Sequence, residues 1–76
     1  MVLYRVKYSK DVEEKNYAYS KVYDDFSAMR KKAKELSKIT NRKVYIEWAY
    51  PSNPEFWSLL RTCPNERDLN NLKPKQ

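Results

Sequence analysis

From residue 2 to residue 8, apolar or aromatic side chains occupy every second position. This period of two is typical of a β-strand with one buried face. The polar residues 9–16 indicate a hairpin loop, and the tyrosine-rich residues 17–23 indicate a second strand. The first third of the chain therefore predicts a β-hairpin.

The period of the pattern changes after residue 24. Apolar residues now recur at steps of three and four, which is typical of a helix with one narrow apolar stripe: Phe26, Met29, Ala33 and Leu36. We expect this helix over about residues 25–39. Asp24 or Asp25 can cap its first turn, because a short carboxylate accepts the free backbone N–H groups there. Asn41 can take the left-handed conformation that often ends a helix.

A third strand is predicted over residues 43–50, where every second residue is apolar or aromatic. Two prolines then interrupt the chain, which is typical of a turn or loop. Asn53 can cap a short helix with Pro54 at its first position. We expect this helix to end before Pro64 and to turn four side chains inward: Phe56, Trp57, Leu60 and Cys63.

These elements predict an α+β fold, a two-layer β-β-α-β sandwich. The sheet is expected to be three-stranded and antiparallel in the order 2-1-3, with the main helix on one face and a short C-terminal helix. We expect a single domain over residues 1–66 and a polar, frayed tail over residues 67–76. The expected core is Val2, Tyr4, Val6, Val22, Phe26, Met29, Ala33, Leu36, Val44, Ile46 and Trp48, with Phe56, Trp57 and Leu60 closing one end.

The positive charge is concentrated in one segment. The 76 residues carry a net charge of +6, and residues 30–43 hold seven basic side chains against one acidic. Such a patch attracts phosphates or an acidic protein surface, although lysine is also common on solvated helix faces. The candidate residues for phosphate or acidic-partner binding are Arg30, Lys31, Lys34, Lys38, Arg42 and Lys43.

The sheet face turned away from the main helix is a second candidate surface. Cations interleaved with flat rings can stack nucleic-acid bases, and aromatic residues and arginine are also frequent in protein interfaces. Tyrosine is in addition an ordinary strand residue, the C-terminal helix could cover this face, and a register shift of one residue would exchange the two faces. The expected contacts are Arg5, Lys7, Tyr17, Tyr19, Lys21 and Tyr45.

The composition argues against catalysis and metal binding. The chain has no histidine, no glycine and a single cysteine. It therefore lacks the commonest general base, a set of zinc ligands and every glycine-based phosphate loop. Cys63 lies on an apolar stripe without a histidine to activate it. We expect a protein that is not an enzyme, with no catalytic residue, no metal site, no cofactor and no small-molecule substrate.

Two functions are compatible with these features. The first is a small binding or regulatory protein that docks on an acidic partner protein and modulates or inhibits it, as accessory proteins of phages and mobile elements do in their host. The alternative is DNA or RNA binding, with the basic residues 30–43 on phosphates and the arginine and tyrosines of the sheet face on the bases.

The sequence also bears on compartment and self-association. A single cysteine favours a reducing compartment, the cytoplasm, which is the host cytoplasm if a phage encodes the protein. No apolar run is long enough to span a membrane, so no membrane partner is expected. The strand over residues 17–23 would form a sheet edge with one lysine and no proline. We expect this lightly guarded edge to pair with a partner strand or to form a homodimer.

Overall fold

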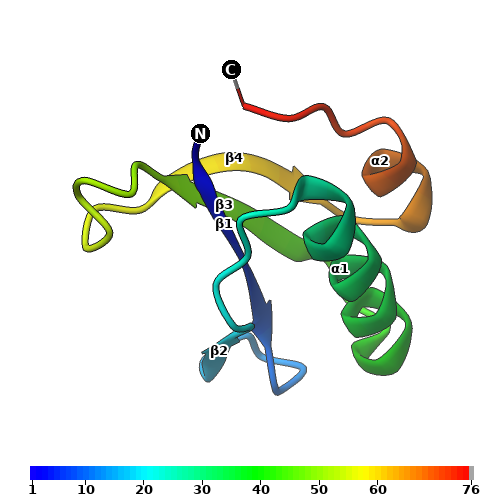
Figure 1. Ribbon diagram of the computed structural model, residues 1–76. Coiled ribbons are helices and arrows are strands. Elements are labelled where there is room, and N and C mark those ends of the chain that lie inside the picture. The colour runs from blue at the N-terminus through cyan, green and yellow to red at the C-terminus, as the bar shows by residue number, and fades with distance from the viewer. Residues whose placement is uncertain (76) are drawn as a thin grey trace.

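The computed structural model describes residues 1–75. Its strands form one antiparallel sheet in the order β2-β1-β3-β4, and both helices lie on one face of it (Figure 1). The strands are β1 (Leu3–Ser9), β2 (Tyr17–Tyr19), β3 (Val44–Ala49) and β4 (Ser58–Cys63), and the helices are α1 (Phe26–Thr40) and α2 (Glu66–Asn70). The α+β class, the antiparallel sheet and the main helix are confirmed. The three-stranded sheet is wrong, because β4 extends the order beyond β3.

Strand β4 replaces the helix predicted over residues 53–63. It pairs with β3 in a register that shifts between Ile46 and Glu47. This bulge interrupts the alternation of side chains, so β4 lacks the period of two that identifies a strand. The apolar residues that predicted a helix here, Trp57, Leu60 and Cys63, follow one another at steps of three, which is a spacing that a helix would also produce. The short helix is present, but it lies later in the chain, at Glu66–Asn70.

Strand β2 is shorter than the predicted strand over residues 17–23. Only Tyr17–Tyr19 pair regularly with β1, and the chain then bulges away before Tyr23 forms an isolated bridge with Tyr4. Ser20 fills the gap, since its Oγ accepts a hydrogen bond of 2.8 Å from the backbone N–H of Val6. Val22 lies in the bulge and is 51% exposed, so its prediction as a core residue was wrong.

Helix α1 begins and ends as its sequence indicates. Asp25 is the N-cap, and its carboxylate accepts a hydrogen bond of 3.2 Å from the backbone N–H of Ser27. Asn41 ends the helix in the left-handed conformation, with φ of 54°. Its backbone N–H donates to the carbonyl of Ser37. Met29, Ala33 and Leu36 form the buried stripe of the helix.

The core lies between the sheet and the helical layer. The predicted side chains of β1, α1 and β3 are in it, with Phe26 and Trp48 only partly buried. Leu60 also packs against the core, but Phe56 is 69% exposed and Trp57 is half-buried on the other face of the sheet. The expectation that Phe56 and Trp57 close an end of the core was therefore wrong.

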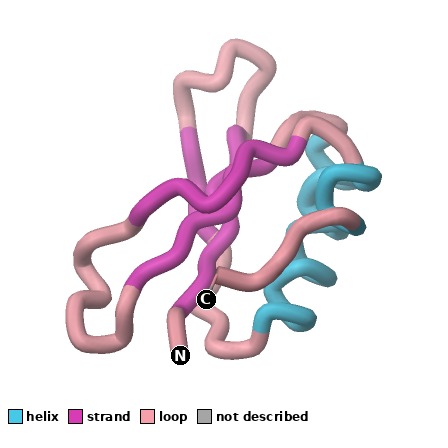
Figure 2. The backbone as a smooth tube through the Cα atoms, turned by 90° about the horizontal axis from the view of Figure 1, so that it is seen from above, coloured by secondary structure: helices cyan, strands magenta, loops and turns pink. Residues whose placement is uncertain are grey.

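The C-terminal segment completes the helical layer. Leu69 in α2 and Leu72 after it are both buried in the core, next to the stripe of α1. The chain then runs back along the sheet (Figure 2), where the backbone N–H of Lys75 donates to the hydroxyl of Tyr4 at 3.0 Å. The expected frayed tail over residues 67–76 is thus packed as far as the structure describes it. Within residues 1–75, no helix has the length and apolar character needed to cross a membrane.

Candidate functional site

The face of the sheet turned away from the helices carries a row of cations and aromatic rings. Arg5 and Lys7 occupy alternate positions of β1, so both point to this side. The register places Glu47 of β3 opposite Arg5 and Tyr45 of β3 opposite Lys7. Strand β2 adds Tyr19 and Tyr17 on the other side of β1. We call this group, with Trp57 from the β3–β4 loop and with Glu14 and Lys43 beside Tyr45, the sheet face: Arg5, Lys7, Glu14, Tyr17, Tyr19, Lys43, Tyr45, Glu47 and Trp57.

Arg5 is the centre of the sheet face. The Cζ of its guanidinium lies 3.9 Å from the ring centroid of Tyr19 and 4.3 Å from that of Trp57. Its Nε donates a hydrogen bond of 2.7 Å to Oε1 of Glu47. Two cation–π contacts and one charge-assisted hydrogen bond therefore hold the guanidinium in place. Four segments of the chain meet at this one side chain.

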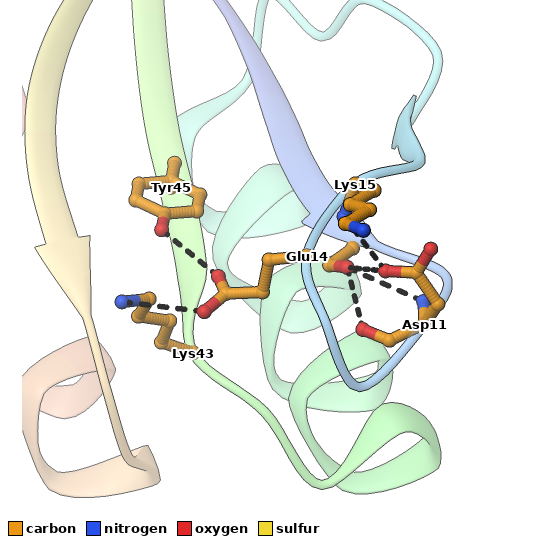
Figure 3. A network of polar contacts seen from close by, with 6 residues as sticks. Asp11, Glu14, Lys15, Lys43 and Tyr45 are labelled. Carbon is orange, nitrogen blue, oxygen red and sulfur yellow. Dashed lines mark hydrogen bonds and ion pairs between the residues drawn. The ribbon is translucent and has the colours of Figure 1, made fainter.

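A second cluster forms around Tyr45 (Figure 3). The Nζ of Lys7 lies 4.5 Å from the ring centroid of Tyr17 and 5.6 Å from that of Tyr45. The hydroxyl of Tyr45 donates to Oε1 of Glu14 at 3.2 Å, and Oε2 of Glu14 lies 3.6 Å from Nζ of Lys43. The hydroxyl of Tyr45 and the carboxylate of Glu14 beside Lys43 raise the pKa of that amine. Lys43 therefore remains protonated and belongs to the sheet face.

The loop over residues 10–16 holds Glu14 in this position. Glu14 has a left-handed backbone with φ of 56°, which is unfavourable for a residue with a Cβ. Asp11 organises the turn, because its carboxylate accepts hydrogen bonds from the backbone N–H of Lys15 at 2.9 Å and from the side chain of Asn16 at 2.7 Å. The contacts of Glu14 with Tyr45 and Lys43 offset the local strain. The predicted polar loop is thus ordered, and Glu14 connects it to the sheet face.

The charges of the sheet face largely neutralise one another. Glu47 pairs with Arg5 and Glu14 pairs with Lys43, so Lys7 is the cation of this group that makes no ion pair within the described residues. Lys21 does not join the group, contrary to expectation. Its Nζ lies 5.0 Å from the ring of Tyr23, which packs against the core.

Sequence reasoning missed three members of this surface. Glu47 could have been found, because it alternates in phase with Tyr45 along the same strand. Trp57 gave no such signal, since its apolar character favoured the core. Nothing in the loop sequence indicated that Glu14 would reach β3.

The outer side of α1 forms the second surface, which we call the helix ridge. It consists of Arg30, Lys31, Lys34 and Lys38. Among the described residues, none of these four side chains pairs with a carboxylate. The neighbouring Lys32 does pair, with Glu35 at 3.2 Å.

The helix ridge borders a hollow between α1 and the start of α2. This hollow has a volume of about 330 Å³. It is lined by Glu35 and Glu66 and by three lysines of the ridge, which are Lys31, Lys34 and Lys38. These three lysines therefore line one hollow, which they share with two carboxylate residues.

The remaining two predicted basic residues lie elsewhere. Arg42 and Lys43 follow the end of α1 and line an open depression of about 540 Å³ with Glu14 and Pro64. The six candidate residues of the basic segment 30–43 are therefore divided, with four on the helix ridge and two where the helix end meets the hairpin loop.

The helix ridge and the sheet face lie on opposite sides of the molecule. The apolar stripe of α1 packs on one face of the sheet, so the ridge points away from it, and the sheet face is on the far side (Figure 1). One short ligand cannot lie along the ridge and on the sheet face together. The two surfaces therefore have to be considered as separate sites.

Neither a cluster of metal ligands nor a cysteine with a favoured thiolate is found in the described residues. Within residues 1–75, no group of three or more His, Cys, Asp or Glu side chains is placed to hold a metal ion. Cys63 is buried, and this burial raises the pKa of its thiol, although the charge of nearby Arg61 opposes part of the rise. The thiolate that would act as a nucleophile is thus disfavoured.

Comparison with protein families, with curated proteins and with solved structures finds no match to this chain. Its function therefore has to be inferred from its own surfaces.

Proposed function

We propose that this protein binds nucleic acid without catalysis, by placing the helix ridge on the phosphate backbone. The observation that supports this proposal is the row of four ridge cations on the outer side of α1, none of them paired with a carboxylate within residues 1–75. Cations with no carboxylate partner are free to bind phosphates and to release the counterions of the nucleic acid.

The spacing of the ridge suits a strand of phosphates. Lys31 and Lys38 are seven residues apart, which is about 10 Å along a helix axis. Along the axis of a duplex, where each strand carries one phosphate per about 3.4 Å, this distance spans about three base pairs. Because the buried stripe of α1 fixes the helix on the sheet, the backbone positions of these lysines are fixed in a row before binding. Such contacts position a nucleic acid and do not read its sequence.

The sheet face supports nucleic-acid binding less well than the sequence suggested. Arg5 and Lys43 already have carboxylate partners, and cations already cover a face of the Tyr17 and Tyr19 rings. The proposed binding therefore relies on the helix ridge and does not include base stacking by the sheet face.

The test is fluorescence anisotropy with labelled single-stranded and duplex DNA and RNA over a series of salt concentrations. The ridge variant is Lys31→Glu/Lys34→Glu/Lys38→Glu. The control variant Lys10→Glu/Lys15→Glu/Lys73→Glu changes the net charge equally at exposed lysines outside the ridge. We expect the ridge variant to bind at least tenfold more weakly than the control, with both variants folded by circular dichroism.

Three results would contradict the proposal: no binding at low salt, an affinity independent of salt, or equal losses in the two variants. Equal losses would mean that overall charge, and not the ridge, attracts the nucleic acid.

A second candidate function is binding of a partner protein by the sheet face. The observation that favours it is the stack of Trp57, Arg5 and Tyr19, the three residue types most enriched at binding hot spots. Two further exposed apolar side chains are close to Trp57 in the chain: Phe56 in the β3–β4 loop and Leu59 in β4. The role of an accessory protein that modulates a partner, suggested by the sequence, belongs to this candidate.

This second function is tested by affinity capture followed by reconstitution with the purified partner. A partner that binds the wild type and the Ile39→Ala variant, but not Tyr19→Ala, would support docking on the sheet face. Ile39 is an exposed position of α1 and serves as the control. Equal binding by both variants would exclude this surface.

A further inference from the structure

Strand β4 is an open edge of the sheet. It pairs with β3 on one side, and within the described residues no backbone hydrogen bond links it to any other element. In Figure 2, which looks down on this edge, no other segment lies across the strand. The opposite edge is much shorter, because β2 pairs over only three residues, Tyr17–Tyr19. The edge expected at residues 17–23 is thus the less suitable of the two for pairing with a strand of another chain.

The edge of β4 has few of the features that prevent pairing with another strand. Ser58–Cys63 contain no proline and no lysine, although natural edges often use these residues as guards. The one charged side chain, Arg61, is directed to Asp68 of α2, with Nη2 3.3 Å from Oδ1. Leu59 is 57% exposed and adds apolar surface beside the free backbone groups.

The bulge gives β4 an unusual order of faces. Ser58, Arg61 and Cys63 lie opposite the core-side residues of β3, and Leu60 packs against the core. Leu59 and Thr62 lie opposite Glu47 and Tyr45, on the sheet face. From Ser58 to Cys63, the six side chains therefore point in turn to the core side, the sheet face, the core side, the core side, the sheet face and the core side. This order is the same when it is read in either direction.

We propose that the partner of this edge is a second copy of the chain, paired antiparallel along β4. The two-fold axis passes between Leu60 and Arg61, so Leu59 lies opposite Thr62 of the second copy and Leu60 lies opposite its Arg61. Residues opposite each other in an antiparallel pair must point to the same side of the sheet. The symmetric face order meets this condition at all six positions, which an uninterrupted strand could not do in this register.

The charges are also compatible with this pairing. No like charges lie opposite each other, because each Arg61 faces a leucine and keeps its own Asp68. An axis perpendicular to the sheet leaves both α1 helices on the same side of the joined sheet. The dimer then carries two helix ridges on one side, which would double the phosphate contacts of the proposed function. The dimer itself does not depend on that function.

The test is sedimentation velocity of the protein from about 5 to about 500 µM, a range that covers micromolar dissociation constants. We expect a dimer that dissociates on dilution. In Leu59→Lys/Thr62→Lys, two lysines of one copy lie directly opposite two lysines of the other, which weakens antiparallel pairing. We expect the dimer dissociation constant to rise at least about tenfold. Val12→Lys/Ile39→Lys adds the same charge at exposed apolar positions outside β4 and should dimerise like the wild type.

A charge exchange makes the test specific for this register. Leu59→Glu/Thr62→Glu alone should be monomeric, whereas its mixture with the lysine variant should form a one-to-one heterodimer. Circular dichroism confirms that each variant is folded. A wild type that is monomeric at 500 µM would overturn the proposal. A dimer that survives in the lysine variant, or a mixture that does not associate, would also overturn it.

Discussion

Arg5 and Glu47 face each other across β1 and β3, with Nε of Arg5 2.7 Å from Oε1 of Glu47. Only 22% of the arginine side chain and 14% of the glutamate side chain are exposed. Glu47→Ala would leave a half-buried cation without its carboxylate. We expect the free energy of unfolding to fall by about 1–2 kcal/mol, measured by urea denaturation.

The matched control for this pair is Glu13→Ala. It removes an ion pair with Lys15 in which the two side chains are 75% and 70% exposed. Such a pair contributes little, so we expect a change of less than about 0.5 kcal/mol. Equal effects of the two variants would show that the ion pair of Arg5 and Glu47 contributes no more to the free energy of unfolding than an exposed pair.

The C-terminal segment should contribute strongly to stability. Leu72 is 5% exposed and packs in the core, so Leu72→Ala is expected to lower the free energy of unfolding by about 2–4 kcal/mol. Ile39→Ala, at a position that is 72% exposed, should change it by less than about 0.5 kcal/mol. Thermal and urea denaturation check both values. A frayed tail would instead make Leu72→Ala as mild as Ile39→Ala.

The hairpin loop should lose stability in acid through Asp11. Desolvation would raise the pKa of this carboxyl, but hydrogen bonds from Lys15, Asn16 and Ser9 outweigh it and hold the pKa below its ordinary value of 3.8. The folded state therefore gains stability from Asp11 above pH 3.8, and this contribution disappears as the pH falls through the lower folded value.

The variant Asp11→Asn tests this contribution. It should be less stable than the wild type at pH 7, and the difference should shrink as the pH falls below about 4. Midpoints of thermal unfolding between pH 2 and pH 7 measure the effect. Glu55→Gln removes a carboxylate that makes no hydrogen bond in the described residues and should leave the curve unchanged. A parallel shift of the Asp11→Asn curve at every pH would contradict the prediction.

Single lysines of the helix ridge should each change the salt dependence of binding. If Lys34 contacts one phosphate, Lys34→Gln should reduce the log–log salt slope on duplex DNA by about 0.9. Lys21→Gln is the control, because Lys21 lies beside Tyr23 and away from the ridge. Anisotropy titrations at four or more salt concentrations give both slopes. An unchanged slope for Lys34→Gln would remove this lysine from the binding surface.

The amino-acid sequence by itself determined the local features of this protein. The stripe of Met29, Ala33 and Leu36, the cap at Asp25 and the left-handed Asn41 all depend on residues close together in the chain. They could be predicted because helix periodicity and capping act within a few residues. The alternation in β1 and β3 likewise indicated correctly that Arg5, Lys7 and Tyr45 point away from the helix. The concentration of charge in residues 30–43 is also a property of the sequence alone.

Tertiary structure decided the features that depend on segments distant in the chain. Strand β4 exists because it pairs with β3, and the bulge opposite Ile46 hides the period of two that would have revealed it. Arg5 meets Glu47, 42 residues away, only because β1 and β3 are neighbours in this register. Leu69 and Leu72 are buried because α2 closes the space beside α1. The separation of the helix ridge from the sheet face also follows from packing, since only the packed helix defines which cations point outward.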